Sequence, residues 1–228
     1  MESFSTNEAG KSPQQILPGL YRFPPNRETL GGSAYLIAAS KRSLLIDCPP
    51  WTEATQTFLQ EQGGVELLFI THRNGASAQL PKIQAEFNCS VLIQEQEAYL
   101  FPTVRCQTFQ SAYSHDFLGE AIWTPGYSPG SACWYWPEQG GVLFTGRHVL
   151  CNQYGQAVPL RTAKTFHWFR QLNSIGNLRD RFTPETLAHL CPGANVGLLR
   201  GASSLENPCL SLTQLDLTAL RNDAIADT

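Results

Sequence analysis

The 228-residue sequence predicts a layered protein of strands and helices, of the α/β or α+β class. Short apolar runs typical of strands alternate with segments whose apolar residues recur at helical spacing. This alternation fills the first half of the chain, and the second half starts again with strands. No motif repeats at an interval of about 20–50 residues, so a solenoid is not expected.

The first half is expected to contain strands at residues 20–23, 34–37, 44–46, 67–70 and 90–93. Trp51, Ala54, Phe58 and Leu59 predict a helix that ends at the glycine pair 63–64. Ala76, Leu80, Ile83 and Phe87 follow at i, i+4, i+7 and i+11, which predicts a second, amphipathic helix.

The second half is expected to contain strands at residues 121–123, 132–136 and 142–144, each bounded by Gly and Pro. Helices are expected at 162–175, 183–187 and 212–224, and residues 102–119 show no period and are expected to form a loop. We expect residues 1–15 to be a flexible polar tail and residues 16–228 to form a single domain.

Composition excludes several functions. The sequence is 42% hydrophobic and 15% charged, as in globular proteins, and its net charge of −3 offers no basic surface for nucleic acid. No apolar run approaches the roughly 18–20 residues of a membrane span. Seven cysteines without regular spacing, and a polar start without a secretory signal, predict reduced thiols and a cytoplasmic protein.

Seven short segments are more specific than the periodicity. They are Pro18-Gly19-Leu20-Tyr21, Ser33-Ala34-Tyr35-Leu36-Ile37, Leu44-Leu45-Ile46-Asp47-Cys48, Phe69-Ile70-Thr71-His72, Thr124-Pro125-Gly126-Tyr127-Ser128-Pro129-Gly130-Ser131, Leu143-Phe144-Thr145-Gly146-Arg147 and Cys191-Pro192-Gly193-Ala194. In this order and spacing the chain resembles the metallo-β-lactamase superfamily, most closely its glyoxalase II-like hydrolases. The resemblance implies an α+β fold, a four-layer αββα sandwich with the active site along one edge.

Members of this superfamily usually bind two metal ions, commonly zinc, through seven ligands. The resemblance implies that His72, Asn74, Ala76, Ser77, Tyr127, Arg147 and Ala194 stand at those positions, in place of His, His, Asp, His, His, Asp and His. Only His72 keeps its ligand type. Asp47 matches a residue that supports the site without being one of these ligands.

These replacements remove the donors that zinc needs. Zinc binds imidazole, thiolate or carboxylate, usually three or four together, whereas Asn, Ser and Tyr are poor substitutes and Ala contributes nothing. Arg147 reverses a charge: at ~4 Å and an effective ε of about 20, a dication would meet about 8 kcal/mol of repulsion. We therefore predict that the dinuclear site is lost and that the protein carries no cofactor.

The remaining polar residues each allow two readings. Arg147 could bind the carboxylate or phosphate of a small anionic ligand, or form an internal salt bridge with Asp47. His72 could be a ligand or general base, or could hydrogen-bond its own loop. Tyr127 could donate to a ligand, or its ring could fill the vacated space. Arg73 is expected to point to solvent.

A replacement metal site for zinc or iron is an alternative, built from His72, His148, Cys151, His189 and Cys191. The sequence favours a catalytically degenerate protein, a pseudoenzyme that acts as a binding, scaffold or regulatory protein, with a protein partner as one possibility. The alternatives are a hydrolase of a thioester, lactone or phosphoester with an atypical metal site, and a sensor of a small anionic ligand in the vacated pocket.

Overall fold

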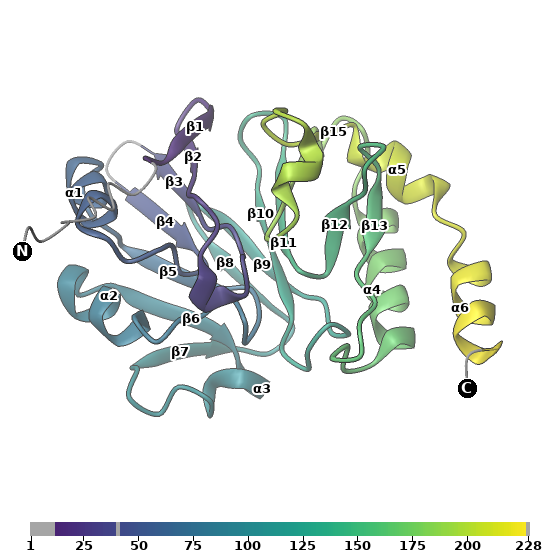
Figure 1. Ribbon diagram of the computed structural model, residues 1–228, viewed down its shortest axis with the longest axis horizontal. Helices are drawn as coiled ribbons and strands as arrows, with labels where there is room; N and C mark the ends of the chain where they lie inside the picture. The colour runs from purple at the N-terminus through teal and green to yellow at the C-terminus, as the bar shows by residue number, and fades with distance from the viewer. Residues whose placement is uncertain (1–11, 40–41, 227–228) are drawn as a thin grey trace, which may run out of the picture.

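Two β-sheets pack face to face and carry helices on their outer sides (Figure 1). The structure is a computed structural model that describes residues 12–39 and 42–226. The helices α1 (Glu53–Glu61) and α2 (Leu80–Phe87) cover the first sheet, and α4 (Trp168–Arg181) covers the second. The expected αββα sandwich is confirmed.

The first sheet has seven strands in sequence order. They are β1 (Gln14–Leu17), β2 (Leu20–Arg22), β3 (Tyr35–Ala39), β4 (Arg42–Ile46), β5 (Leu67–Ile70), β6 (Ser90–Gln94) and β7 (Cys106–Phe109). The strands β1 to β4 pair antiparallel and β4 to β7 pair parallel. The parallel strands need crossover connections, which α1 and α2 provide, while α3 (Glu95–Ala98) directly follows β6.

The second sheet has six strands in the order β15-β14-β11-β10-β9-β8. They are β8 (Ala112–His115), β9 (Gly119–Trp123), β10 (Ala132–Trp136), β11 (Val142–Gly146), β14 (His189–Pro192) and β15 (Leu205–Glu206). A two-stranded ribbon of β12 (Val149–Cys151) and β13 (Ala157–Pro159) follows β11. The helices α5 (Pro208–Gln214) and α6 (Leu217–Ala226) close the chain, and two short 3-10 helices occur at Arg27–Thr29 and Val196–Leu199.

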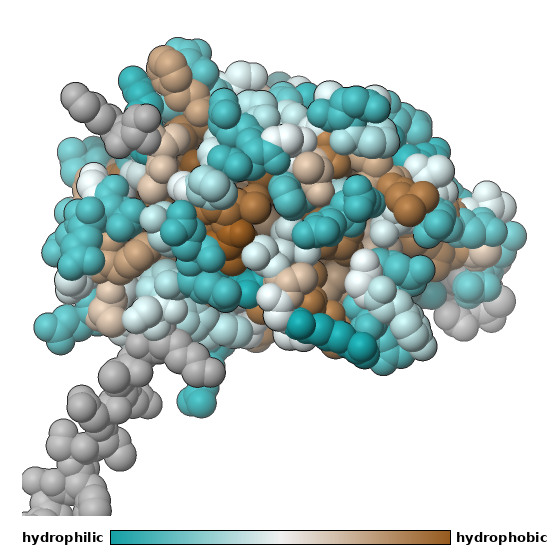
Figure 2. Space-filling model, turned by 90° about the horizontal axis from the view of Figure 1, so that it is seen from above, coloured by the Kyte–Doolittle hydropathy of each residue, from teal (hydrophilic) through white to brown (hydrophobic). Residues whose placement is uncertain are grey.

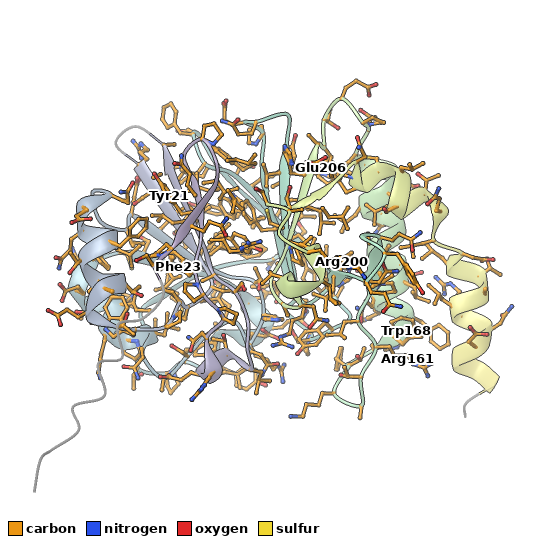
Figure 3. The ribbon with its side chains drawn as sticks, turned by 45° about the horizontal axis from the view of Figure 1, so that its top comes forward. Tyr21, Phe23, Arg161, Trp168, Arg200 and Glu206 are labelled. Atoms are coloured by element: carbon orange, nitrogen blue, oxygen red, sulfur yellow. The ribbon has the colours of Figure 1, made fainter. Side chains whose placement is uncertain are left out.

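The main core lies between the two sheets. Alternate residues of the inner strands meet there, among them Ile46, Phe69, Trp134 and Phe144. The other faces of the sheets pack against the helices. For example, Tyr21 and Phe23 of the first sheet region contact the ring of Phe58 in α1 edge-on, at centroid distances of 5.2 and 5.9 Å (Figure 3).

The strongest apolar runs give the best agreement with the sequence analysis. The expected strands 67–70 and 132–136 coincide with β5 and β10, and the others agree within a few residues. The expected loop 102–119 is wrong, because it contains β7 and β8. These strands lie at the edges of their sheets and carry polar residues on their exposed faces, so they lack an apolar run.

The expected helices also differ from the observed ones, mainly in where they begin and end. The helix expected through Ala76 begins at Leu80, and the one expected from residue 162 begins at Trp168. The expected helix 183–187 is a turn, and the closing segment 212–224 falls in two helices separated near Leu215. None of the described helices is long and apolar enough to cross a membrane.

The expected tail also ends earlier than residue 15. Gln14 and Gln15 are paired with β2 as part of β1, and residues 1–11 of the expected tail lie outside the described residues.

Candidate functional site

Most of the segments that carry the sequence motifs meet at one edge of the sandwich, whereas Pro18 and Gly19 of the first motif lie at the opposite end. Asp47 follows β4, His72 follows β5, and Arg147 follows β11. The backbone N–H of Ala132 donates to the carbonyl of Thr71 at 2.8 Å, which joins the second sheet to the first at this edge. Two strands of the second sheet, β11 and β14, also end side by side here: the N–H of Gly193 donates to the Gly146 carbonyl at 2.7 Å.

Asp47 is buried at the centre of this edge and both its oxygens are occupied. Oδ1 accepts from the backbone N–H of Thr71 at 2.8 Å, and Oδ2 accepts from the Thr71 hydroxyl at 2.7 Å. Gly75 passes so close that a Cβ there would overlap Asp47 Oδ1. Burial raises the pKa of Asp47 to about 6, against the opposing effects of the Thr71 hydrogen bonds and the Arg147 charge.

His72 is buried beneath Tyr127. The two rings lie 4.9 Å apart with an interplanar angle of 39°. His72 Nδ1 lies 3.4 Å from the Thr71 hydroxyl, and its Nε2 is buried without a hydrogen bond to the described residues. Burial lowers the pKa of His72 to about 3, with smaller contributions from Arg147 and Arg73, so the ring is neutral at physiological pH.

Tyr127 fills the space above His72. It is 5% exposed, and its hydroxyl donates to Asn74 Oδ1 at 3.1 Å. Burial raises the pKa of Tyr127, so the phenol stays protonated. Of the two roles expected for Tyr127, this geometry supports the one in which its ring fills space, here the space above His72.

Arg147 does not pair with Asp47, so the internal salt bridge, one of its two readings, is not formed. Its Nη2 instead donates to the carbonyls of Thr29 and Leu30, at 3.1 and 2.6 Å. The guanidinium is thus bound to the turn between β2 and β3, while the Asp47 oxygens accept from Thr71. Its charge still lowers the pKa of Asp47, so the two groups interact through space.

Three of the candidate positions have local structural roles. Ala76 packs into the core beneath α2, and Ala194 is 4% exposed. Ser77 accepts a hydrogen bond from the backbone N–H of Gln79 at 3.2 Å. None of the three presents a metal-binding group to the centre of the site.

Arg73 does not simply point to solvent, which corrects the sequence expectation. Its Nε lies 3.1 Å from Oε1 of Glu97, whose side chain is fully buried. The same carboxylate oxygen accepts from the backbone N–H of Gly130 at 3.3 Å. A buried carboxylate requires a partner, and Arg73 supplies the positive charge.

The residues considered for a replacement metal site do not lie together. Cys191 packs between the sheets, Cys151 lies in a separate apolar cluster, and His189 pairs with the Ser204 hydroxyl at 2.9 Å. His148 is buried and its ring makes no hydrogen bond to the described residues. Over the part of the chain that the structure describes, no three His, Cys, Asp or Glu side chains gather closely enough to share a metal ion.

Thr71, Gly75 and Glu97 are site residues that the sequence analysis missed. Thr71 and Gly75 stand beside candidate ligands, but their contacts with Asp47 depend on how β4 and β5 end. Glu97 has no local signal at all, since the chain around it resembles that around the exposed Glu95.

A small cavity of about 270 Å³ lies over the site. Its lining comes from three segments: Arg73 and Asn74, then Tyr127, Ser128 and Pro129, then Lys164 and Phe166. A larger hollow of about 710 Å³ lies at the opposite end of the sandwich, where β4 begins and β10 ends, and is lined by Pro18, Gly19, Ala38, Ala39, Arg42, Phe117, Trp136, Glu138 and Gln139. Viewed from above, apolar side chains gather near the middle of the surface (Figure 2).

No protein-family model and no curated protein matches the sequence. Solved structures do match. A Cronobacter sakazakii metallo-β-lactamase with a HARLDQ motif is 14% identical, with 95% of this chain and 98% of that chain covered and a TM-score of 0.65. The protein TTHA1623 in a di-iron-bound form is 19% identical, covering 79% and 98%, with a TM-score of 0.62.

A quorum-quenching N-acyl homoserine lactone lactonase is 17% identical, covering 71% of this chain and 86% of that chain, with a TM-score of 0.53. The similar proteins thus include hydrolases, a lactamase and a lactonase by name. At these identities the likeness shows the fold alone, and it agrees with the two sheets and the outer helices. The chain has the metallo-β-lactamase fold.

Proposed function

We propose that this protein is a catalytically inactive relative of the metallo-β-lactamase-fold hydrolases and acts as a binding or scaffold protein. One observation carries the proposal: the centre of the site is closed by the protein's own side chains. The Tyr127 ring lies on His72, its hydroxyl bonds Asn74, and the Arg147 guanidinium is tied to the Thr29 and Leu30 carbonyls.

The donor set does not fit two zinc ions. Among the seven ligand positions only His72 offers a donor that zinc favours, and Asp47 has both oxygens engaged by Thr71. The nearby Arg147 adds a positive charge that repels a cation. A stable metal centre needs three or four good donors together, which this edge lacks among the described residues.

The site also lacks an activated nucleophile. His72 is neutral and poorly basic because burial lowers its pKa to about 3, and the Tyr127 hydroxyl is protonated and bound to Asn74. A general base works best when its pKa lies near the operating pH. Asp47 has a pKa of about 6, but it is buried and both its oxygens accept hydrogen bonds from Thr71, so it is not available to activate water. Hydrolysis of a thioester, lactone or phosphoester therefore has no evident base in the residues around Tyr127.

The proposal is tested by metal content and by turnover. After dialysis against zinc and then buffer, we expect fewer than about 0.1 zinc ions per chain and no change in melting temperature with a chelator. A lactonase of the same fold serves as the control for loading and for the thioester and lactone panel. Roughly one tightly held zinc or iron per chain, or turnover that His72→Ala abolishes, would overturn the proposal.

The cysteines accord with a reduced, cytoplasmic protein, which remains part of the proposal. All seven are free thiols. Burial raises the pKa of Cys48, Cys133 and Cys191 to about 12, so these three are protonated and unreactive.

A further inference from the structure

We propose that the cavity over Tyr127 binds a small molecule that joins a carboxylate to an apolar ring. The inference deepens the proposed binding function by naming the class of ligand. It rests on the charges, the exposed aromatic surface and the rigid walls of the cavity lined by Arg73, Asn74, Tyr127, Ser128, Pro129, Lys164 and Phe166.

Arg73 belongs to the lining of this cavity and has two nitrogens without a partner among the described residues. Its Nε is held by Glu97 Oε1 at 3.1 Å, and the guanidinium makes no other hydrogen bond to the described residues. The side chain is 35% exposed, so the two terminal nitrogens can be reached from solvent. A guanidinium binds a carboxylate through two parallel hydrogen bonds, and the bond to Glu97 orients the group for this in advance.

The lining carries an excess of positive charge. Lys164 is exposed and forms no ion pair with the described residues, and no acidic side chain belongs to the lining. The buried Glu97 behind the wall balances one of the two cations, which leaves a net charge of about +1. This charge favours a monoanion over a neutral molecule or a cation.

The other walls suit a ring. Phe166 is 51% exposed, and Pro129 and the Tyr127 ring complete an apolar surface beside the cations. Exposed aromatic surface next to a cation is a common arrangement in small-molecule sites. At about 270 Å³ the cavity admits a single ring with its charged group.

The walls are held in place before any ligand binds. The N–H groups of Phe166 and His167 donate to the carbonyls of Tyr127 and Gly126 at 3.1 and 2.9 Å, which joins the segment before α4 to the loop between β9 and β10. Trp123 Nε1 donates to the Pro129 carbonyl at 2.9 Å. Next to this segment Arg161 lies over the Trp168 ring at 5.5 Å (Figure 3). Rigid walls lower the entropic cost of binding.

The test is a calorimetric titration of the full chain with benzoate, benzamide, acetate and inorganic phosphate. We expect benzoate to bind about tenfold or more tightly than benzamide, because benzamide lacks the charge that Arg73 would bind. Acetate lacks the ring and is expected to bind more weakly than benzoate. Phosphate binding as tightly as benzoate would overturn the requirement for a ring.

Variants locate the site. Arg73→Lys keeps a positive charge beside Glu97 but cannot form the bidentate hydrogen bonds to a carboxylate, so it should weaken benzoate binding about tenfold. Lys164→Gln should weaken it a few-fold, whereas Lys82→Gln, an exposed lysine on α2 outside the cavity, is the matched control and should change nothing. Equal effects of the two lysine variants, or no benzoate binding at millimolar concentration, would overturn the inference. The outcome of the benzoate titrations does not change the metal content or the turnover of the protein. The proposed function is therefore tested independently of this inference.

Discussion

The buried Asp47 makes a specific prediction about pH. Its two oxygens accept from Thr71, yet burial still raises its pKa from 3.8 to about 6. Between these two values the unfolded chain loses the proton more readily than the folded one. Asp47 therefore reduces stability as pH rises from about 4 to about 6, and the reduction stays constant above about 6.

The size of this effect follows from the shift. About two pKa units correspond to about 3 kcal/mol at neutral pH. Asp47→Asn removes the titration and keeps the shape: the amide oxygen can accept from the Thr71 N–H, and the amide nitrogen can donate to the Thr71 hydroxyl. Asn also tolerates the left-handed backbone of this position, where φ is 59°.

Urea unfolding, followed by tryptophan fluorescence, measures the difference between the two proteins across this pH range. The stability of Asp47→Asn relative to the wild type should rise by about 3 kcal/mol between about pH 4 and pH 7. Asp180→Asn, whose side chain is 69% exposed, is the control and should show a nearly flat difference. A flat difference for Asp47→Asn too would refute the reasoning.

Three further predictions concern the same edge. Arg147→Ala should lower the free energy of unfolding by about 1–3 kcal/mol through the two lost hydrogen bonds, and Arg147→Lys should recover only part of it, as urea unfolding would show. Gly75→Ala should cost more than Gly197→Ala in the same assay, because its Cβ overlaps Asp47 whereas Gly197 faces open space and has no left-handed backbone. Burial lowers the pKa of His148 from 6.5 to about 3, so this residue costs stability as pH falls below about 6.5. His148→Leu should reduce that acid sensitivity, measured as melting temperatures at neutral and mildly acidic pH; equal acid sensitivity in both proteins would contradict it.

Among the strands, sequence periodicity predicted those that are largely buried and missed the partly exposed edge strands β7 and β8. The strand β5, with four consecutive buried residues, was located to the residue. The strand β8 alternates exposed and half-buried positions, and its residues resemble a loop. The expected helix at 183–187 is a turn at 184–186, and Leu187 after it packs in one cluster with Leu178 of α4.

The motifs located the candidate site but could not assign its partners. The positions of His72, Tyr127 and Arg147 at one edge follow from the order of the segments. The choice of Thr29 and Leu30 over Asp47 as partners of Arg147 depends on where the β2–β3 turn lies in space. A contact between residues more than a hundred positions apart leaves no trace in local spacing.

Arg147 also bears on the conditions under which this edge becomes ordered. A dissociable ion orders a loop only while its concentration exceeds its dissociation constant. The guanidinium of Arg147 is joined covalently to the end of β11, so it is present at its carbonyl partners in every copy of the chain. The turn between β2 and β3 is therefore bound by one cationic group, the Arg147 guanidinium, as soon as the chain folds. Neither dilution nor a chelator can remove this group.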